Sequence, residues 1–195
     1  MPLRFATEPA NGTELVRSGL DKISARPTSP LGDVDFGSLS VSAPHAVYDL
    51  RADAVANGGG LASAVFTGYR YLVDAGGAPV AAAEVQADDS GAARLLANIN
   101  YGPYVVATAQ GLARVESLPT VSSGVYEVRL LRFSAAAVMA LWLKPDSGEP
   151  DIIYPLPPTP PGLEPERPYS DGEFIEAVMP VARRRAAAIG QTTLP

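Results

Sequence analysis

The stretch YEVRLLRFSAAAVMALWLKPDSGEPDIIYPL, residues 126–156, decides the fold, because it holds the longest apolar run in the chain and its single tryptophan, Trp142. Residues 126–133 combine β-branched and aromatic side chains and predict a strand. Residues 151–156 predict another strand after a turn. We expect this stretch to form the central ribbon of a sheet, with Trp142 in the core.

The middle of this stretch, SAAAVMALWLK at 134–144, allows two interpretations. Ser134 could cap a buried helix, whereas the short apolar run that ends before Pro145 suits a central strand. The strand, over residues 137–144, is favoured.

Upstream residues predict a short strand followed by an antiparallel meander. AVYDL at 46–50 is typical of a strand, and Asp49 is expected to cap a short helix through residues 51–56. TGYRYLVD and VAAAEVQ alternate on either side of Gly76-Gly77, which is a β-hairpin signal. ARLLANIN, at 93–100, adds a third strand beyond the turn DDSG. Connections this short imply antiparallel neighbours.

Two helices are expected to cover the sheet. Pro103 suits the first position of a helix over about 103–118, because apolar residues follow it at helical spacing. SDGE at 170–173 is a capping box that begins a C-terminal helix over about 171–189, which Pro180 should kink or split. The predicted fold class is therefore α+β, an antiparallel sheet of about five to six strands with both helices on the same face.

The chain is expected to form one domain with irregular ends. Residues 1–40 show no sustained period and predict a poorly ordered extension that can include one docked piece. Residues 41–189 should form the single domain, and residues 190–195 a frayed tail. The proline-rich arm, PLPPTPPGLEPERP at 155–168, is expected to be a polyproline II segment that wraps across its own domain and leads into the last helix.

The composition excludes several classes of function. The 195-residue chain has no cysteine and one histidine, His45, which excludes disulfides, thiolate chemistry and multi-histidine metal sites. The formal charge of -6 argues against nucleic acid and anionic membranes as partners. The most apolar window, 135–143, is far shorter than the roughly 20 residues needed to cross a bilayer. The sequence predicts a soluble, cytoplasmic protein, and its Arg-, Ala-, Gly- and Pro-rich composition is typical of a high-GC bacterial genome.

No motif of a known cofactor site is present, and neither a cofactor nor a metal is predicted. The run 57–60, Asn-Gly-Gly-Gly, lacks the spacing of a dinucleotide- or phosphate-binding loop and is expected to end a helix. The catalytic candidates are carboxylates on predicted strands, since paired acids can perform acid–base chemistry or hold a divalent cation. These candidates are Glu84, Glu127 and Asp151.

Acidic residues are concentrated late in the chain, around the proline-rich arm. The candidate binding residues are Asp146, Glu149, Asp151, Glu164 and Glu166. We expect a non-enzymatic binding or accessory protein that contacts another protein through this acidic arm or through an exposed sheet edge. The alternatives are a small hydrolase or divalent-cation-dependent enzyme that uses the strand carboxylates, and a structural subunit of a larger assembly.

Overall fold

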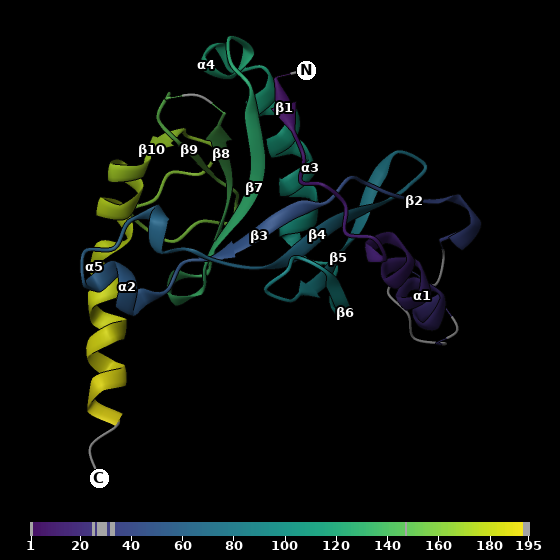
Figure 1. Ribbon diagram of the computed structural model, residues 1–195, viewed down its shortest axis with the longest axis horizontal. Coiled ribbons are helices and arrows are strands. Elements are labelled where there is room, and N and C mark those ends of the chain that lie inside the picture. Colours follow the sequence, from purple (N-terminus) through teal and green to yellow (C-terminus); the bar gives the residue numbers. More distant parts are fainter. Residues whose placement is uncertain (1, 25, 27–30, 32–33, 147, 193–195) are drawn as a thin grey trace.

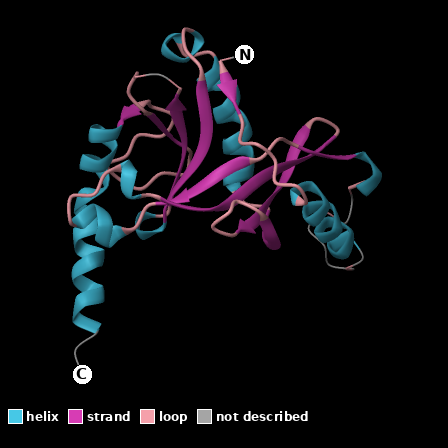
Figure 2. Cartoon of the chain, viewed as in Figure 1, coloured by secondary structure: helices cyan, strands magenta, loops and turns pink. Residues whose placement is uncertain are grey.

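The computed structural model describes residues 2–24, 26, 31, 34–146 and 148–192, and these residues form an α+β fold around one twisted mixed sheet (Figure 1). Figure 2 shows the strands in magenta and the helices packed around them. Ten strands belong to the sheet within the described part of the chain. In spatial order, eight of them are β10 (Tyr169–Ser170), β9 (Ile152–Pro155), β8 (Val138–Pro145), β7 (Tyr126–Phe133), β3 (His45–Asp49), β4 (Val65–Ala75), β5 (Ala78–Ala87) and β6 (Ala93–Asn100).

Two further short strands pair at the sides of this path. β1 (Leu3–Arg4) pairs with β7, and β2 (Leu39–Val41) pairs with β4. Strands of two or three residues are too short to show a period of two, so the pattern of the sequence misses them. The predicted sheet of five to six strands was too small, and the ten strands of the sheet include these two and the two-residue β10.

The prediction of an antiparallel sheet was also wrong, because β3 and β7 run parallel. Ala46–Asp49 lie beside Arg129–Arg132, and β1 pairs with β7 in the same parallel sense. Everything from the end of β3 to residue 125 therefore forms one long crossover, and such a crossover is what parallel neighbours require. Short turns correctly indicated the meander β4–β5–β6, but they carry no information about where the chain re-enters the sheet.

The two long helices lie on opposite faces of the sheet, not on the same face as predicted. Successive residues of a strand point to opposite faces. On β7, Leu130 packs with Ala107 and Val115 of α3 (Pro103–Glu116), whereas Leu131 packs with Phe174 of α5 (Asp171–Thr192). Burial on both faces explains why β7 and β8 read as nearly continuous apolar runs.

The face opposite α3 is covered at both ends of the sheet (Figure 1). At one end, α2 (Ala52–Ala56) packs with α5, and at the other end α1 (Gly12–Ser24) packs over β4, β5 and β6. Val16 and Leu20 of α1 are buried there. This part of the predicted N-terminal extension thus belongs to the packed structure, while residues 25, 27–30 and 32–33 lie outside the described residues.

Several local predictions are confirmed. The hairpin β4–β5 turns at Gly76 and Gly77, and the ambiguous segment is the strand β8. A short 3-10 turn, Ser134–Ala136, precedes it. One local prediction is wrong: Asp49 does not cap the short helix α2, because Arg51 occupies the N-cap position.

The proline-rich arm wraps across its own domain, as predicted. Leu156 and Leu163 are buried on opposite faces of the sheet, and the Tyr104 hydroxyl of α3 lies 2.8 Å from the carbonyl oxygen of Pro158.

Beyond the arm, α5 runs through Pro180 as one helix, so the proline does not split it. The helix continues to Thr192, inside the predicted frayed tail, and residues 193–195 lie outside the described residues. Three smaller elements complete the description: the short helix α4 (Pro119–Ser122) and the 3-10 turns at Phe36–Ser38 and Leu61–Ser63.

Among the described helices, none combines the length and the apolar character that crossing a bilayer requires.

Candidate functional site

Four ion-paired side chains on the α3 face of the sheet form a cluster that we call the arginine centre: Asp49, Arg70, Glu84 and Arg132. Arg132 donates from Nε and Nη2 to the two carboxylate oxygens of Asp49, at 2.7 and 3.2 Å, and from Nη1 to Glu84 Oε2 at 2.7 Å. Arg70 donates from Nη1 to the other oxygen of Glu84, at 2.7 Å. Bidentate arginine–carboxylate pairs of this kind hold their geometry well. The centre joins β3, β4, β5 and β7.

Strand register places these residues. Asp49 pairs directly with Arg132 across β3 and β7, and Arg70 pairs directly with Glu84 across β4 and β5. Between the two pairs lies Gly68 of β4, with a φ of +150°. A Cβ at this position would lie 2.1 Å from the carbonyl oxygen of Val85, so only glycine permits this approach of β4 to β5.

Arg70 is the most deeply buried charged side chain of the centre. Only 1% of its side chain is exposed, and this burial lowers its pKa, while the charge of Glu84 opposes that change. Burial also lowers the pKa of Arg132, but its hydrogen bond with Asp49 and the charge of Glu84 outweigh that effect and raise the pKa. Arginine stays protonated in proteins, so a buried guanidinium needs compensating acceptors. Within the described residues, Nε and Nη2 of Arg70 have no hydrogen-bond partner.

His45 lies beside Arg70 in the register of β3 and β4. Its Nδ1 lies 3.2 Å from the carbonyl oxygen of Arg70, and its side chain packs edge-on against Phe5. Burial lowers the pKa of His45 to about 4, so the imidazole is neutral at pH 7. Nδ1 therefore carries the proton donated to the carbonyl, and Nε2, which has no hydrogen-bond partner among the described residues, is the unprotonated nitrogen.

Two adjoining cavities open on the arginine centre, and Glu84, Asn98 and Arg132 line both of them. The first has a volume of ≈ 460 Å³ and lies on the side of Asp49 and Thr67. The second, of ≈ 260 Å³, lies between the sheet and the beginning of α3. We call the second one the α3 cavity. Its remaining lining residues are Arg70, Asn100, Gly102, Tyr104, Val105 and Met139.

A separate concavity of ≈ 770 Å³ lies between the proline-rich arm and the first turns of α5, and we call it the arm groove. Segment 159–165 forms one wall. The other wall contains Arg167, whose guanidinium lies 4.6 Å from the ring centre of Tyr169 and 3.3 Å from Glu173. The acidic residues of the groove are Glu164, Glu173 and Glu176, all of them exposed.

The structure does not bring the three predicted catalytic carboxylates together. Glu84 belongs to the arginine centre, on the α3 face. Glu127 accepts a hydrogen bond from Arg129, at 2.8 Å, on the opposite face. Asp151 accepts from Trp142 Nε1 at 2.9 Å and from Lys144 at 3.0 Å, also away from Glu84.

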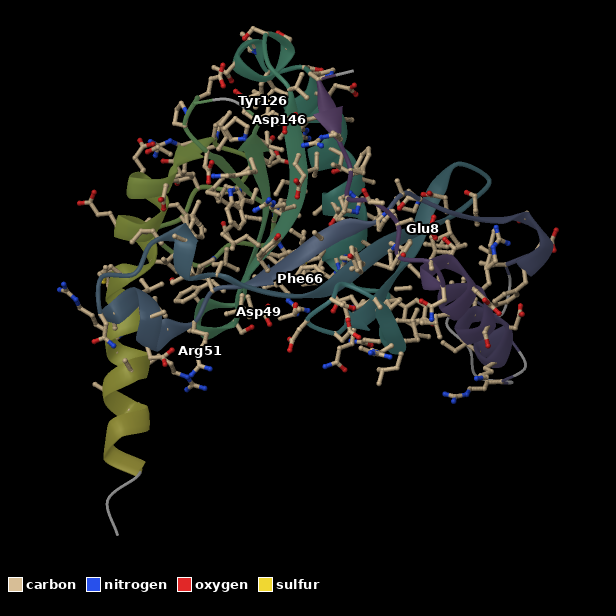
Figure 3. The ribbon with its side chains drawn as sticks, in the orientation of Figure 1. Glu8, Asp49, Arg51, Phe66, Tyr126 and Asp146 are labelled. Carbon is tan, nitrogen blue, oxygen red and sulfur yellow. The ribbon has the colours of Figure 1, made fainter. Side chains whose placement is uncertain are left out.

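The predicted binding residues are likewise spread over several places. Asp146 pairs with Arg4 and lies next to Tyr126, at the beginning of β7. It is far from Asp49, which lies near the other end of β7 (Figure 3). Glu149 is exposed in the turn before β9, and Glu166 pairs with Arg114 of α3. Of the five acids, Glu164 alone lines the arm groove.

Sequence reasoning missed the two arginines of the centre and the polar residues of the α3 cavity. The signal that could have found them is a single charged residue inside each of several apolar strands, as in YRYL, AAEV and LLRF. Glu84 was singled out on this ground, but Arg70 and Arg132 show the same pattern. Charges on buried strands need partners, and here they are each other's partners.

Among the described residues, no three His, Asp or Glu side chains gather in the way a metal ion would require. Comparison of the chain with family models, with curated proteins and with solved structures finds no match.

Proposed function

We propose that the protein is a non-enzymatic accessory protein that binds a basic segment of a partner protein in the arm groove. The observation that carries this proposal is the charge of a concave surface: three exposed carboxylates, Glu164, Glu173 and Glu176, face one cation, Arg167. A segment that offers lysine or arginine side chains complements this charge.

The groove also has features of a surface that can hold an extended chain. Its wall of prolines, in segment 159–165, is fixed in φ and loses little entropy on binding. Tyr169 is held in place under Arg167, and its hydroxyl accepts a hydrogen bond from the backbone N–H of Glu164. The groove is therefore preorganised before a partner arrives.

The carboxylate-hydrolase alternative gains no support from the geometry. Glu84, Glu127 and Asp151 are each paired with a cation, and Glu84 lies on a different face from the other two. Both carboxylate oxygens of Glu84 already accept hydrogen bonds from arginine side chains, so neither is free to take a proton from a substrate.

The proposal is tested on a peptide array in which the number and spacing of Lys and Arg vary among extended segments. The groove variant carries Glu164→Lys and Glu176→Lys, and the control carries Glu14→Lys and Glu116→Lys, which are exposed acids outside the groove with the same total change of charge. We expect the wild type and the control to select the same basic peptides. The groove variant should bind them at least about tenfold more weakly, because it replaces attraction by repulsion.

Two results contradict the proposal. If no peptide binds above background at low ionic strength, where charge complementarity is strongest, the groove is not a site for basic segments. If both variants lose binding equally, the attraction is a property of the overall charge of -6 and not of the groove.

A further inference from the structure

We propose that α5 pairs with α5 of a second copy of the chain, antiparallel and around a two-fold axis that passes between Met179 and Pro180. The surface is one stripe along this helix, which we call the α5 stripe. It borders the arm groove only through Glu176, and it needs no partner in that groove. The inference rests on the position of the helix, its shape and the placement of its charges.

α5 lies at the outer edge of the molecule, and its C-terminal half reaches past α2 (Figure 1). An open concavity of ≈ 440 Å³ follows the helix, and every residue that lines it belongs to α5: Gly172, Ile175, Glu176, Met179, Pro180 and Arg183. Most of these positions lie three or four residues apart, so they share one side of the helix. Phe174 and Val178, by contrast, belong to the core. The α5 stripe is therefore a face of the helix that the described part of the chain leaves open.

The two charges of the α5 stripe have no partner along their own helix. Ion pairs on one helix form three or four positions apart. No cation lies at these distances from Glu176, and no acid lies at them from Arg183. The two residues are seven positions apart, which is about 10 Å along the axis. Both are exposed, and within the described part of the chain neither forms an ion pair.

A second copy supplies both missing charges at once. When two α5 helices lie antiparallel around the proposed axis, Glu176 of each copy faces Arg183 of the other. A parallel arrangement would instead place acid beside acid and cation beside cation. A surface that is its own complement after a two-fold rotation is what a closed dimer requires. The charges of the α5 stripe therefore specify both the partner and its direction.

The centre of the α5 stripe is apolar, and its ends are small. Ile175 and Met179 are half-buried, so each packs against the core and keeps part of its side chain open to a second helix. The unbranched methionine side chain adapts to a neighbouring surface. The proposed axis places Gly172 opposite Ala187, and both are exposed. Their small size allows the two helices to approach closely at both ends of the stripe.

Pro180 adds a backbone acceptor to this surface. Proline has no N–H, so the helix bond that would otherwise reach the carbonyl oxygen of Glu176 is absent. Arginine carries five N–H donors, more than one carboxylate uses. The guanidinium of Arg183 from the second copy therefore has donors for this carbonyl as well as for the Glu176 carboxylate.

The test is sedimentation equilibrium of the full chain at concentrations from about 10 to about 500 µM, which detects a dimer with a Kd up to about 1 mM. The salt concentration is held at about 0.1 M, because two copies that each carry a charge of -6 repel at long range and this ionic strength screens that repulsion. We expect a reversible equilibrium between monomer and dimer, without larger species.

Charge reversal locates the interface. Arg183→Glu and Glu176→Arg each turn two attractive pairs into repulsive ones, because a two-fold axis uses every residue twice. Each variant should therefore weaken the dimer at least about tenfold. Arg185→Glu, about 200° around the helix from Arg183, is the control for the first. Glu14→Arg, at an exposed position of α1, is the control for the second, and both controls should dimerise as the wild type does.

An equimolar mixture of the Arg183→Glu and Glu176→Arg chains tests the antiparallel pairing directly. One chain then carries two acids on its α5 stripe and the other carries two cations, so both pairs between unlike chains are attractive. Each variant alone should be largely monomeric, whereas the mixture should dimerise as strongly as the wild type. Circular dichroism of each variant checks that these exposed substitutions preserve the fold.

Three results overturn the inference. The first is a wild-type chain that stays monomeric over the whole concentration range or forms species larger than a dimer. The second is a dimer that either charge reversal leaves intact, which would place the interface elsewhere. The third is a mixture of the two variants that remains monomeric. Arg183→Glu keeps every carboxylate of the arm groove, so its binding to the peptide array tests the proposed function separately.

Discussion

Arg132 Nη1 and Glu84 Oε2 lie 2.7 Å apart, although β3 and β4 separate their two strands in the sheet. Neighbouring strands are spaced by about 4.8 Å, so the two side chains together reach across three such intervals. On the way, the Arg132 guanidinium also contacts Asp49 of β3 and Thr67 of β4. One side chain from β7 therefore joins the early meander to the late part of the sheet.

Glu84→Leu should destabilise the protein by about 3–5 kcal/mol, because it leaves the buried guanidinium of Arg70 without its only described carboxylate. Urea unfolding followed by circular dichroism measures this loss. The double variant Arg70→Met, Glu84→Leu should be more stable than Glu84→Leu alone, since it removes the uncompensated charge. If the double variant instead loses the sum of the two single effects, the two side chains are not coupled.

His45 should make stability fall on acidification between about pH 6.5 and pH 4. Burial lowers its pKa to about 4 in the folded protein, from 6.5 in the unfolded chain. In this window the unfolded chain binds a proton that the folded protein does not. The free energy of unfolding therefore decreases as the pH is lowered, by about 3 kcal/mol in total. Above pH 6.5 this contribution is fully present.

The measurement is the difference in unfolding free energy between the wild type and His45→Gln, at about pH 7 and about pH 4. The variant should lose less stability on acidification than the wild type. Asp88 and Glu173, whose pKa values are lowered by bonds to Ser90 and Ser170, titrate in both proteins and cancel in the difference. Parallel pH profiles would show that His45 titrates normally in the fold.

Ser170→Ala should cost about 1 kcal/mol by removing the cap of α5. Glu173 accepts hydrogen bonds from the backbone N–H and the hydroxyl of Ser170, both at 2.8 Å, which is half of the predicted capping box. The reciprocal bond, from Glu173 N–H to the Ser170 hydroxyl, is longer at 3.4 Å. Ser122→Ala, in α4, is the control, and an unchanged melting temperature of Ser170→Ala would count against the cap.

Trp142→Ala should cost roughly 3–5 kcal/mol, because the side chain is buried in the core under α5. The substitution also removes three interactions of the indole: its ring contact with Tyr48, its hydrogen bond to Asp151, and its cation–π contact with the guanidinium of Arg129, which lies 4.9 Å from the ring centre. Calorimetry of the variant measures the loss. In the wild type, iodide should quench the tryptophan fluorescence weakly, and strong quenching would contradict the burial.

The parts of the fold that the sequence predicted are those that depend on neighbours in the chain. The hairpin at Gly76-Gly77 and the capping box at Ser170 are decided by a few adjacent residues, and both are present. Trp142 also lies in the core, as expected from the apolar run around it.

The parts that could not be predicted depend on register between distant strands. Nothing in residues 45–49 indicates that they pair in parallel with residues 129–132, because the crossover between them has no signature of its own. The opposite placement of α3 and α5 follows from that pairing. The arginine centre follows as well, since Asp49 and Arg132 meet only in this register.

The parallel pairing of β1 with β7 sets the order in which the chain can fold during synthesis. Leu3 and Arg4 must wait for Tyr126 and Glu127 before they find their partners, whereas β4, β5 and β6 are complete within a few dozen residues. The high contact order of the first pairing makes it a late event. The growing chain should therefore present a finished meander with an unpaired β3 edge until β7 leaves the ribosome, and this is the interval in which a chaperone would be most useful.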